Sequence, residues 1–138
     1  MGKSLDALAS YFRSQADEFL GACEAAGILL TVIDTDRTPA EQQQKLADGV
    51  SWTTHSKHLP QPPEGLSEAI DVCPTVYLAM KGWNSAGPLW AQIGAIGEKL
   101  GMFWGGRWTH INGGRGDPGH FQYIHAQVQL GVDEATQI

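Results

Sequence analysis

Apolar residues recur at three- and four-residue steps near the start of the chain and predict an amphipathic helix over residues 4–27. Ser4 is a suitable N-cap for this helix, and Gly27 suits the left-handed position after its last turn. The run from Ile28 to Ile33 is apolar and partly β-branched, which is typical of a buried strand. The apolar face of the helix consists of Leu5, Leu8, Phe12, Phe19, Cys23 and Ala26.

The rest of the chain alternates short helices, strands and loops. Thr38-Pro39-Ala40-Glu41 combines a capping box with proline at the first helical position, and predicts a second helix that ends near Gly49. A third helix is predicted over residues 88–100. Strands are expected at 68–72, 102–104 and 121–125, and loops at 50–65 and 105–119. We therefore expect an α+β fold, a single domain over 1–138 with helices packed on a small, mostly antiparallel sheet.

Composition narrows the function classes. The 138 residues include 42% hydrophobic and 17% charged residues, which is a globular balance. A net charge of −6 argues against a general nucleic-acid binder. The two cysteines, Cys23 and Cys73, form neither a disulfide framework nor a four-thiolate zinc site, and we expect both to be buried. The longest apolar stretch, residues 25–33, is too short to cross a bilayer, and the first residues have no hydrophobic signal core. We expect synthesis in the cytoplasm.

Three short segments carry candidate chemistry: Ser56-Lys57-His58, Ala69-Ile70-Asp71 and Asp117-Pro118-Gly119-His120. Two histidines and one carboxylate suit a catalytic zinc ion that keeps a fourth position open for water. Asp117 precedes His120 by three residues, so a carboxylate is available near such a metal to take a proton from that water. The HExxH helix signature is absent, which excludes that class of metalloprotease.

These segments resemble the zinc peptidases of bacterial cell walls, which include D-alanyl-D-alanine carboxypeptidases of the VanY and VanX type and phage L-alanyl-D-glutamate endolysins. That family has the pattern Ser-x-His, Gly-x-Ala-x-Asp, then Glu or Asp-x-x-His. Two further stretches are similar to the family: Asp36-Arg37-Thr38-Pro39-Ala40-Glu41-Gln42, and Trp104-Gly105-Gly106-Arg107-Trp108. The resemblance covers about residues 35–123 in the right order.

The resemblance implies roles for five residues. His58, Asp71 and His120 bind Zn²⁺, and Asp117 is the general base. Arg37 stabilises the developing oxyanion or holds a substrate carboxylate, for which its planar fork is well shaped. The implied fold is that of the D-Ala-D-Ala metallopeptidases, without a separate cell-wall-binding domain.

The implied function is a zinc-dependent peptidoglycan hydrolase that cleaves the L-Ala–D-Glu bond of the stem peptide as a phage endolysin. It would act as a monomer in the periplasm, after a holin-type partner has permeabilised the membrane, without inserting into the membrane itself. The alternatives are a D,D-carboxypeptidase of the VanY type and a non-catalytic cell-wall-binding module. A His-Asn-His nuclease that uses His55 or His58 with Asn112 and His120 is disfavoured by the negative charge.

Two departures from the family pattern concern the loops. Residues 59–65 lengthen the stretch between His58 and Asp71, and Ser67 stands where the family has glycine. The loop 106–117 is also longer than usual. Both loops are expected to shape substrate access.

Several residues keep a second interpretation. His55 is an alternative metal ligand, and Arg37 is able to pair instead with Asp34 or Asp36. Trp104 and Trp108 either line the cleft or anchor the core. We expect His110 and His125 to be structural or exposed to solvent.

Overall fold

The computed structural model describes residues 2–49 and 56–125. Within these ranges the helices are α1 (Ser10–Ala25), α2 (Pro39–Ala47) and α3 (Leu89–Lys99). The strands are β1 (Leu30–Asp34), β2 (Ala69–Pro74), β3 (Phe103–Trp104) and β4 (His120–Gln122), joined in part by short 3-10 turns. None of the described helices is both long and apolar enough to traverse a bilayer. The predicted α+β fold is confirmed.

The four strands form an antiparallel sheet in the order β1-β2-β4-β3. In the β2–β4 pair, Ile70 lies opposite Phe121, and Asp71 lies opposite His120. Because side chains alternate between the faces of a sheet, this register gives one face to Ile70 and Phe121 and the other to Asp71 and His120. One register therefore sets both the apolar face and the polar face.

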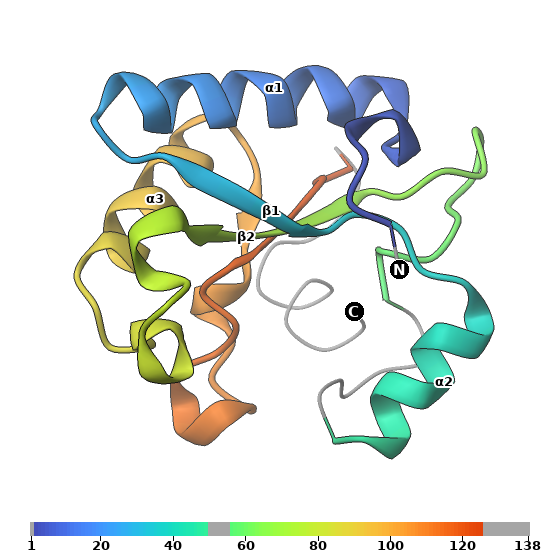
Figure 1. Cartoon of the computed structure of the whole chain (residues 1–138). Coiled ribbons are helices and arrows are strands. Elements are labelled where there is room, and N and C mark those ends of the chain that lie inside the picture. The colour runs from blue at the N-terminus through green and yellow to red at the C-terminus, as the bar shows by residue number, and fades with distance from the viewer. Residues whose placement is uncertain (1, 50–55, 126–138) are drawn as a thin grey trace.

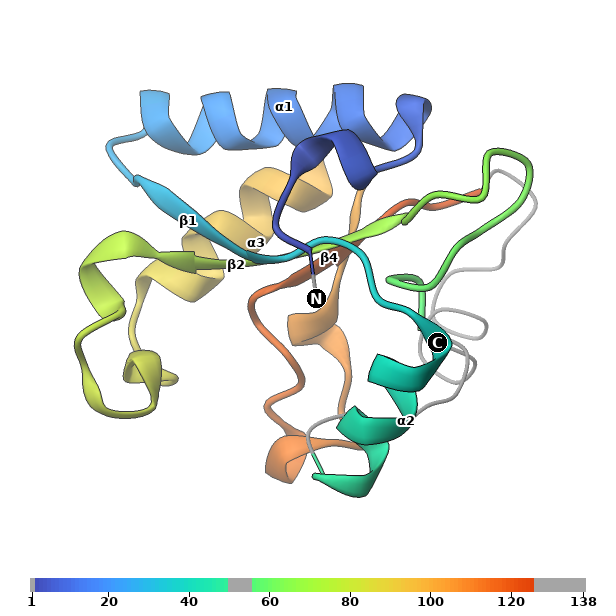
Figure 2. The ribbon, with the colours of Figure 1, turned by 45° about the vertical axis from the view of Figure 1, so that its right-hand side comes forward.

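Helices α1 and α3 pack together against the sheet, and α2 stands apart from them beyond the end of β1 (Figures 1 and 2). Phe121 meets Phe19 of α1 at a ring-centroid distance of 4.4 Å. Gly97 of α3 lies against the same Phe121 ring, where there is no room for a β-carbon. The core thus joins α1, α3 and the apolar face of β4. Its fully buried large side chains include Leu8, Phe12, Phe19, Ile70, Ile93 and Phe121.

The predicted helix boundaries are correct where capping chemistry sets them. Thr38 and Glu41 form both hydrogen bonds of the capping box at the start of α2. Gly27 and Gly101, with φ of 84° and 90°, take the left-handed conformation that ends α1 and α3. The start of α2 and the ends of α1 and α3 could be predicted because a helix cap depends on residues close together in sequence.

The prediction of one continuous helix over 4–27 is wrong at its start. Ser4 caps a short 3-10 turn, Leu5–Ala7, and α1 begins only at Ser10. Between them, Ala9 N donates to the carbonyl oxygen of Ser67 at 2.8 Å, and Ser67 N donates to that of Ala7 at 3.0 Å. A distant segment thus binds the backbone that would have continued the helix. At the other end of the expected helix, Ala26 is exposed and is not part of the apolar face.

The expected strand 121–125 is shorter and begins one residue earlier, as β4. Beyond β4, Tyr123 N still donates to the carbonyl oxygen of Glu68, and His125 Nε2 lies at hydrogen-bond distance, 2.8 Å, from the buried Glu68 Oε1. His125 is therefore structural, as expected.

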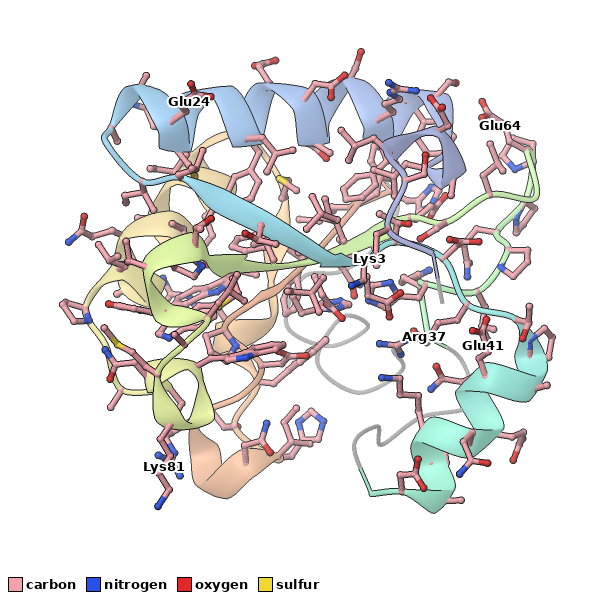
Figure 3. The ribbon with its side chains drawn as sticks, in the orientation of Figure 1. Lys3, Glu24, Arg37, Glu41, Glu64 and Lys81 are labelled. Atoms are coloured by element: carbon pink, nitrogen blue, oxygen red, sulfur yellow. The ribbon has the colours of Figure 1, made fainter. Side chains whose placement is uncertain are left out.

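The proline-rich loop 59–65 is anchored to the start of α1. Glu64 accepts hydrogen bonds from Ser10 N at 2.8 Å and from Ser10 Oγ at 2.5 Å. Figure 3 shows Glu64 beside the N-terminal end of α1, well separated from Arg37. The tip of the loop thus packs against the start of α1, and its expected effect on substrate access stays a prediction.

Candidate metal centre

Three predicted ligands meet at the polar face of the sheet. Asp71 and His120 project from paired positions of β2 and β4, and His58 comes from the segment before β2. Asp71 Oδ1 lies 3.2 Å from His58 Nε2 and 3.0 Å from His120 Nδ1. One donor atom from each residue falls within 4.8 Å of the other two, a spacing that suits one small cation.

His58 presents a nitrogen that lacks a hydrogen-bond partner. The ring is almost fully buried, and Nδ1–H donates to the carbonyl oxygen of Thr35 at 2.9 Å. Nε2 is close to Asp71 but makes no hydrogen bond with any described residue. A buried polar atom without a partner is costly unless something binds it. The lone pair of Nε2, aimed at Asp71 and His120, fits a metal ion.

His120 is buried between a carboxylate and an amide. Nδ1 faces Asp71 Oδ1, and Nε2 lies 2.7 Å from Gln122 Oε1. The Trp108 ring lies beside the imidazole, with the ring centroids 4.9 Å apart. Burial alone lowers the pKa of His120, but the hydrogen bond and charge of Asp71 outweigh it, so the pKa is raised. For Asp71 the effects have the opposite signs. Burial raises its pKa, but the charges and hydrogen bonds of His58 and His120 outweigh burial and hold the pKa of Asp71 well below its usual range.

Arg37 is fixed beside Asp71 by three acceptors. Its Nε donates to Asp34 Oδ2 at 2.7 Å, Nη1 to Gln42 Oε1 at 2.9 Å, and Nη2 to Asp71 Oδ2 at 3.4 Å. A guanidinium has five N–H donors, so two of its hydrogens have no acceptor among residues 2–49 and 56–125. Figure 3 shows Arg37 between β1 and α2. The predicted pairing with Asp34 therefore occurs together with the contact to the candidate centre.

Asp34 reaches this position through an irregularity of β1. The β1–β2 register shifts between Val32 and Asp34, which places Asp34 opposite Asp71. Burial raises the pKa of Asp34, and the charges of His58 and Arg37 partly oppose this rise. Its Oδ1 is buried without a hydrogen-bond partner in the described parts of the chain.

Asp117 lies at the start of the turn into β4. Its backbone N–H donates to Gly105 at 2.9 Å, and its carbonyl oxygen accepts from His120 N at 3.2 Å. Its carboxyl lies close enough to Asp71, His120 and His58 to feel the charge of each. Burial and the charge of Asp71 raise the pKa of Asp117, against the opposing effect of the two histidines. The carboxyl is thus a stronger base than an ordinary aspartate.

The remaining candidates take structural positions. Trp108 is buried beside His120, and Trp104 Nε1 donates to the carbonyl oxygen of Pro118 at 2.8 Å, so both support the β4 turn. Asn112 donates to Gly116 within its own loop, and His110 is exposed. Both cysteines are buried, as expected. His55 lies outside the described residues.

Sequence reasoning missed the residues that orient the candidate ligands. The Thr35 carbonyl, the Gln122 amide and the Ser67 hydroxyl contact these ligands or each other, yet none received a role. Gln122 offered one signal, because on a strand it shares a face with His120 two residues earlier. The other contacts join segments distant in sequence.

Several solved structures share this fold. The L-Ala D-Glu endopeptidase ChiX of Serratia marcescens has 21% sequence identity and a TM-score of 0.62, covering 87% of this chain and 83% of its own. VanYB in complex with D-alanine-D-alanine has 16% identity and a TM-score of 0.57, covering 86% and 72%. A VanY E175A mutant in complex with Zn(II) has 17% identity and a TM-score of 0.54, covering 86% and 73%. No curated protein matches the chain.

A family model described as D-alanyl-D-alanine carboxypeptidase matches residues 49–123, more than half of the chain. This segment contains His58, Asp71, Asp117 and His120. The match confirms the expected family and the expected class of enzyme, a metallopeptidase. It gives no support to the nuclease alternative. The chain belongs to the D-alanyl-D-alanine carboxypeptidase family of metallopeptidases.

Proposed function

We propose that this protein is a zinc-dependent peptidoglycan hydrolase that cleaves the stem peptide at the L-Ala–D-Glu bond. The observation that carries the proposal is the buried, unpartnered Nε2 of His58, which faces Asp71 and His120 across one small space. Two imidazoles and one carboxylate are a donor set that zinc accepts. His58, Asp71 and His120 would hold the ion, which when bound polarises the scissile carbonyl and lowers the pKa of a water molecule.

Asp117 would act as the general base. A carboxyl whose pKa is raised by burial and by the charge of Asp71 accepts a proton more readily than an exposed aspartate. It would take the proton from the attacking water and deliver it to the leaving amine.

Arg37 would bind the oxygen that becomes negative in the transition state, or a carboxylate of the substrate. Asp34, Gln42 and Asp71 hold its guanidinium in place, so little conformational entropy is lost when the two remaining hydrogens meet the substrate. A preorganised donor of this kind stabilises the transition state more than a mobile one.

The bond assignment rests on the resemblance of the motifs to phage endolysins and on the fold shared with ChiX, whose name gives an L-Ala D-Glu endopeptidase. The second candidate is D,D-carboxypeptidase activity, favoured by the family description and by VanYB, which was solved with D-alanine-D-alanine. The phage setting, the holin-type partner, periplasmic action and the monomeric single domain belong to the same proposal and rest on the resemblance alone.

The test is digestion of purified peptidoglycan by the zinc-loaded protein, with products identified by mass spectrometry. A new amino terminus on D-glutamate identifies the endopeptidase, and free D-alanine identifies the carboxypeptidase. Asp117→Asn, which removes the base, should lower kcat by about 10²–10⁴-fold. The matched control Asp17→Asn, at an exposed position of α1, should keep full activity.

Chelation should abolish the activity, and added zinc should restore it. Full activity of Asp117→Asn would refute the assigned base. Full activity after verified removal of the metal would refute the zinc mechanism.

A further inference from the structure

The two histidines of the metal centre face Asp71 with opposite ring nitrogens. His58 uses Nε2, and His120 uses Nδ1. A neutral imidazole carries its proton on only one nitrogen, and the other is free to bind a metal. The centre therefore requires His58 protonated at Nδ1 and His120 protonated at Nε2.

For His58, the backbone meets this requirement. The carbonyl oxygen of Thr35 lies 2.9 Å from Nδ1 and is only able to accept a hydrogen bond. The proton is thus held on Nδ1, by an acceptor that no side-chain substitution removes.

For His120, the acceptor is a side chain. Gln122 Oε1 lies 2.7 Å from Nε2, and Gln122 is fully buried on the same strand and face, two residues after His120. We propose that Gln122 is a positioning residue that keeps the proton of His120 on Nε2 and so leaves Nδ1 free for the metal. This inference deepens the proposed function and rests on it.

The proton of His120 has a competing place. Asp71 Oδ1 lies 3.0 Å from Nδ1, and a carboxylate attracts an N–H more strongly than an amide oxygen does. Without an acceptor at Nε2, the neutral ring would gain most by donating from Nδ1 to Asp71. That tautomer turns the wrong nitrogen toward the metal. Gln122 opposes it, because a buried Nε2–H without an acceptor is costly.

The neutral amide also suits the charge of this site. Asp34, Asp71 and Asp117 already place three carboxyl groups around the two histidines, as their mutual electrostatic effects on pKa show. A glutamine supplies the required acceptor without a fourth negative charge. A glutamate at position 122 has the same size and also offers an acceptor oxygen. Comparing it with an apolar residue of similar length separates the effect of the hydrogen bond from the effect of packing.

The experiment compares the wild type with Gln122→Met, which keeps the length but loses the acceptor, and with Gln122→Glu, which keeps the acceptor. The histidine ring nitrogens of the metal-free proteins are assigned by ¹⁵N NMR at about pH 9, above the ordinary histidine pKa. We expect His120 to be protonated at Nε2 in the wild type and in Gln122→Glu, and at Nδ1 in Gln122→Met.

Zinc affinity is then measured by competition with a chromophoric chelator. Gln122→Met should bind zinc about 10–100-fold more weakly than the wild type, and Gln122→Glu should restore most of the affinity. Gln92→Met, at an exposed position of α3, is the matched control and should bind as the wild type does.

Two results would overturn the inference: a wild-type His120 protonated at Nδ1, or a folded Gln122→Met variant with wild-type tautomer and affinity. The first needs no variant, so the test holds even where Gln122→Met does not fold. If the wild type binds no zinc, the proposed function fails, and the tautomer comparison still decides the role of Gln122.

Discussion

The carbonyl oxygen of Thr35 accepts two hydrogen bonds in the interior, one from His58 Nδ1 and one from Ser67 Oγ. Ser67 occupies the position at which the resembling peptidases have glycine. The Ser67 hydroxyl lies 2.5 Å from the Thr35 carbonyl oxygen and is almost fully buried. This departure from the family pattern thus adds a donor that fixes the acceptor of a predicted ligand.

Replacing Ser67 by alanine should lower the free energy of unfolding by about 1–3 kcal/mol, because the buried Ala69 N–H, 3.2 Å from Ser67 Oγ, loses this acceptor. The Thr35 carbonyl keeps its bond to His58. Urea denaturation of the metal-free protein measures the effect. Ser14→Ala, at an exposed position of α1, is the control and should change stability by less than about 0.5 kcal/mol. Equal stability of the two variants would contradict the role of the Ser67 hydroxyl.

At the scale of single residues, the sequence predicted which side chains could bind a metal or a proton, but not which neighbours orient them. His58, Asp71, His120, Asp117 and Arg37 were predicted because their types and order form a recognisable pattern, and the structure brings them close to one another. Asp34 was predicted only as a partner of Arg37, because a register shift in β1 brings it opposite Asp71. Thr35 was missed because it meets His58 from 23 residues away along the chain. Such long-range contacts leave no local pattern.

At the scale of elements, the close approach of α3 to the sheet depends on Gly97. A β-carbon at this position would lie 2.5 Å from the Phe121 ring and 3.4 Å from the Phe19 ring. Both rings are fully buried, so neither is able to move away easily. The glycine is therefore required by packing, even though alanine forms helices more readily.

Gly97→Ala should lower the free energy of unfolding by about 1–3 kcal/mol, because overpacking outweighs the gain in helix propensity. Gly21→Ala on α1 is a matched control, since a β-carbon there meets nothing within 4 Å. It should raise the stability by up to about 1 kcal/mol. Urea unfolding of both variants gives the comparison, and a shift of the same sign in both would contradict this account of Gly97.

Elements were predictable to the extent that their signals are local. The capping box of α2 and the glycines after α1 and α3 gave correct ends. The N-terminal helix was predicted too long because pairing of Leu8 with Ser67, from a distant segment, competes with helical hydrogen bonds. The order of the strands in the sheet is likewise set by contacts that periodicity does not record.

For the whole molecule, the charges of Asp71 and His120 make the free energy of unfolding depend on pH. The pKa of His120 is raised by Asp71, so its contribution to the stability of the metal-free protein is complete below the ordinary value of 6.5 and is lost as pH rises through the raised value. The pKa of Asp71 is lowered, so its contribution is present above 3.8 and is lost as pH falls through the lowered value. Both contributions are present in mildly acidic solution.

As the proposed ligand, Nδ1 of His120 carries a proton only in the doubly protonated ring, and zinc would have to displace that proton. The rise in Tm on adding zinc should therefore be larger at about pH 8 than at about pH 6. As pH rises through the raised pKa of His120, the metal-free protein should lose the stabilisation given by the protonated ring. Differential scanning calorimetry with and without zinc at the two pH values measures both effects. Asp71→Asn, which loses a charged ligand, should show a much smaller zinc shift. An equal zinc shift at both pH values in the wild type would contradict the proton competition.

The register of β2 against β4 has a consequence for folding as well as for chemistry. A slip of one residue would turn Asp71 or His120 toward α1 and α3, and would turn Ile70 or Phe121 out of the core. Each wrong pairing would bury a charge among apolar helices and expose an aromatic or aliphatic side chain. Asp71 and His120, the proposed ligands, therefore also favour the correct strand alignment, because each misaligned pairing would bury one of them among apolar helices.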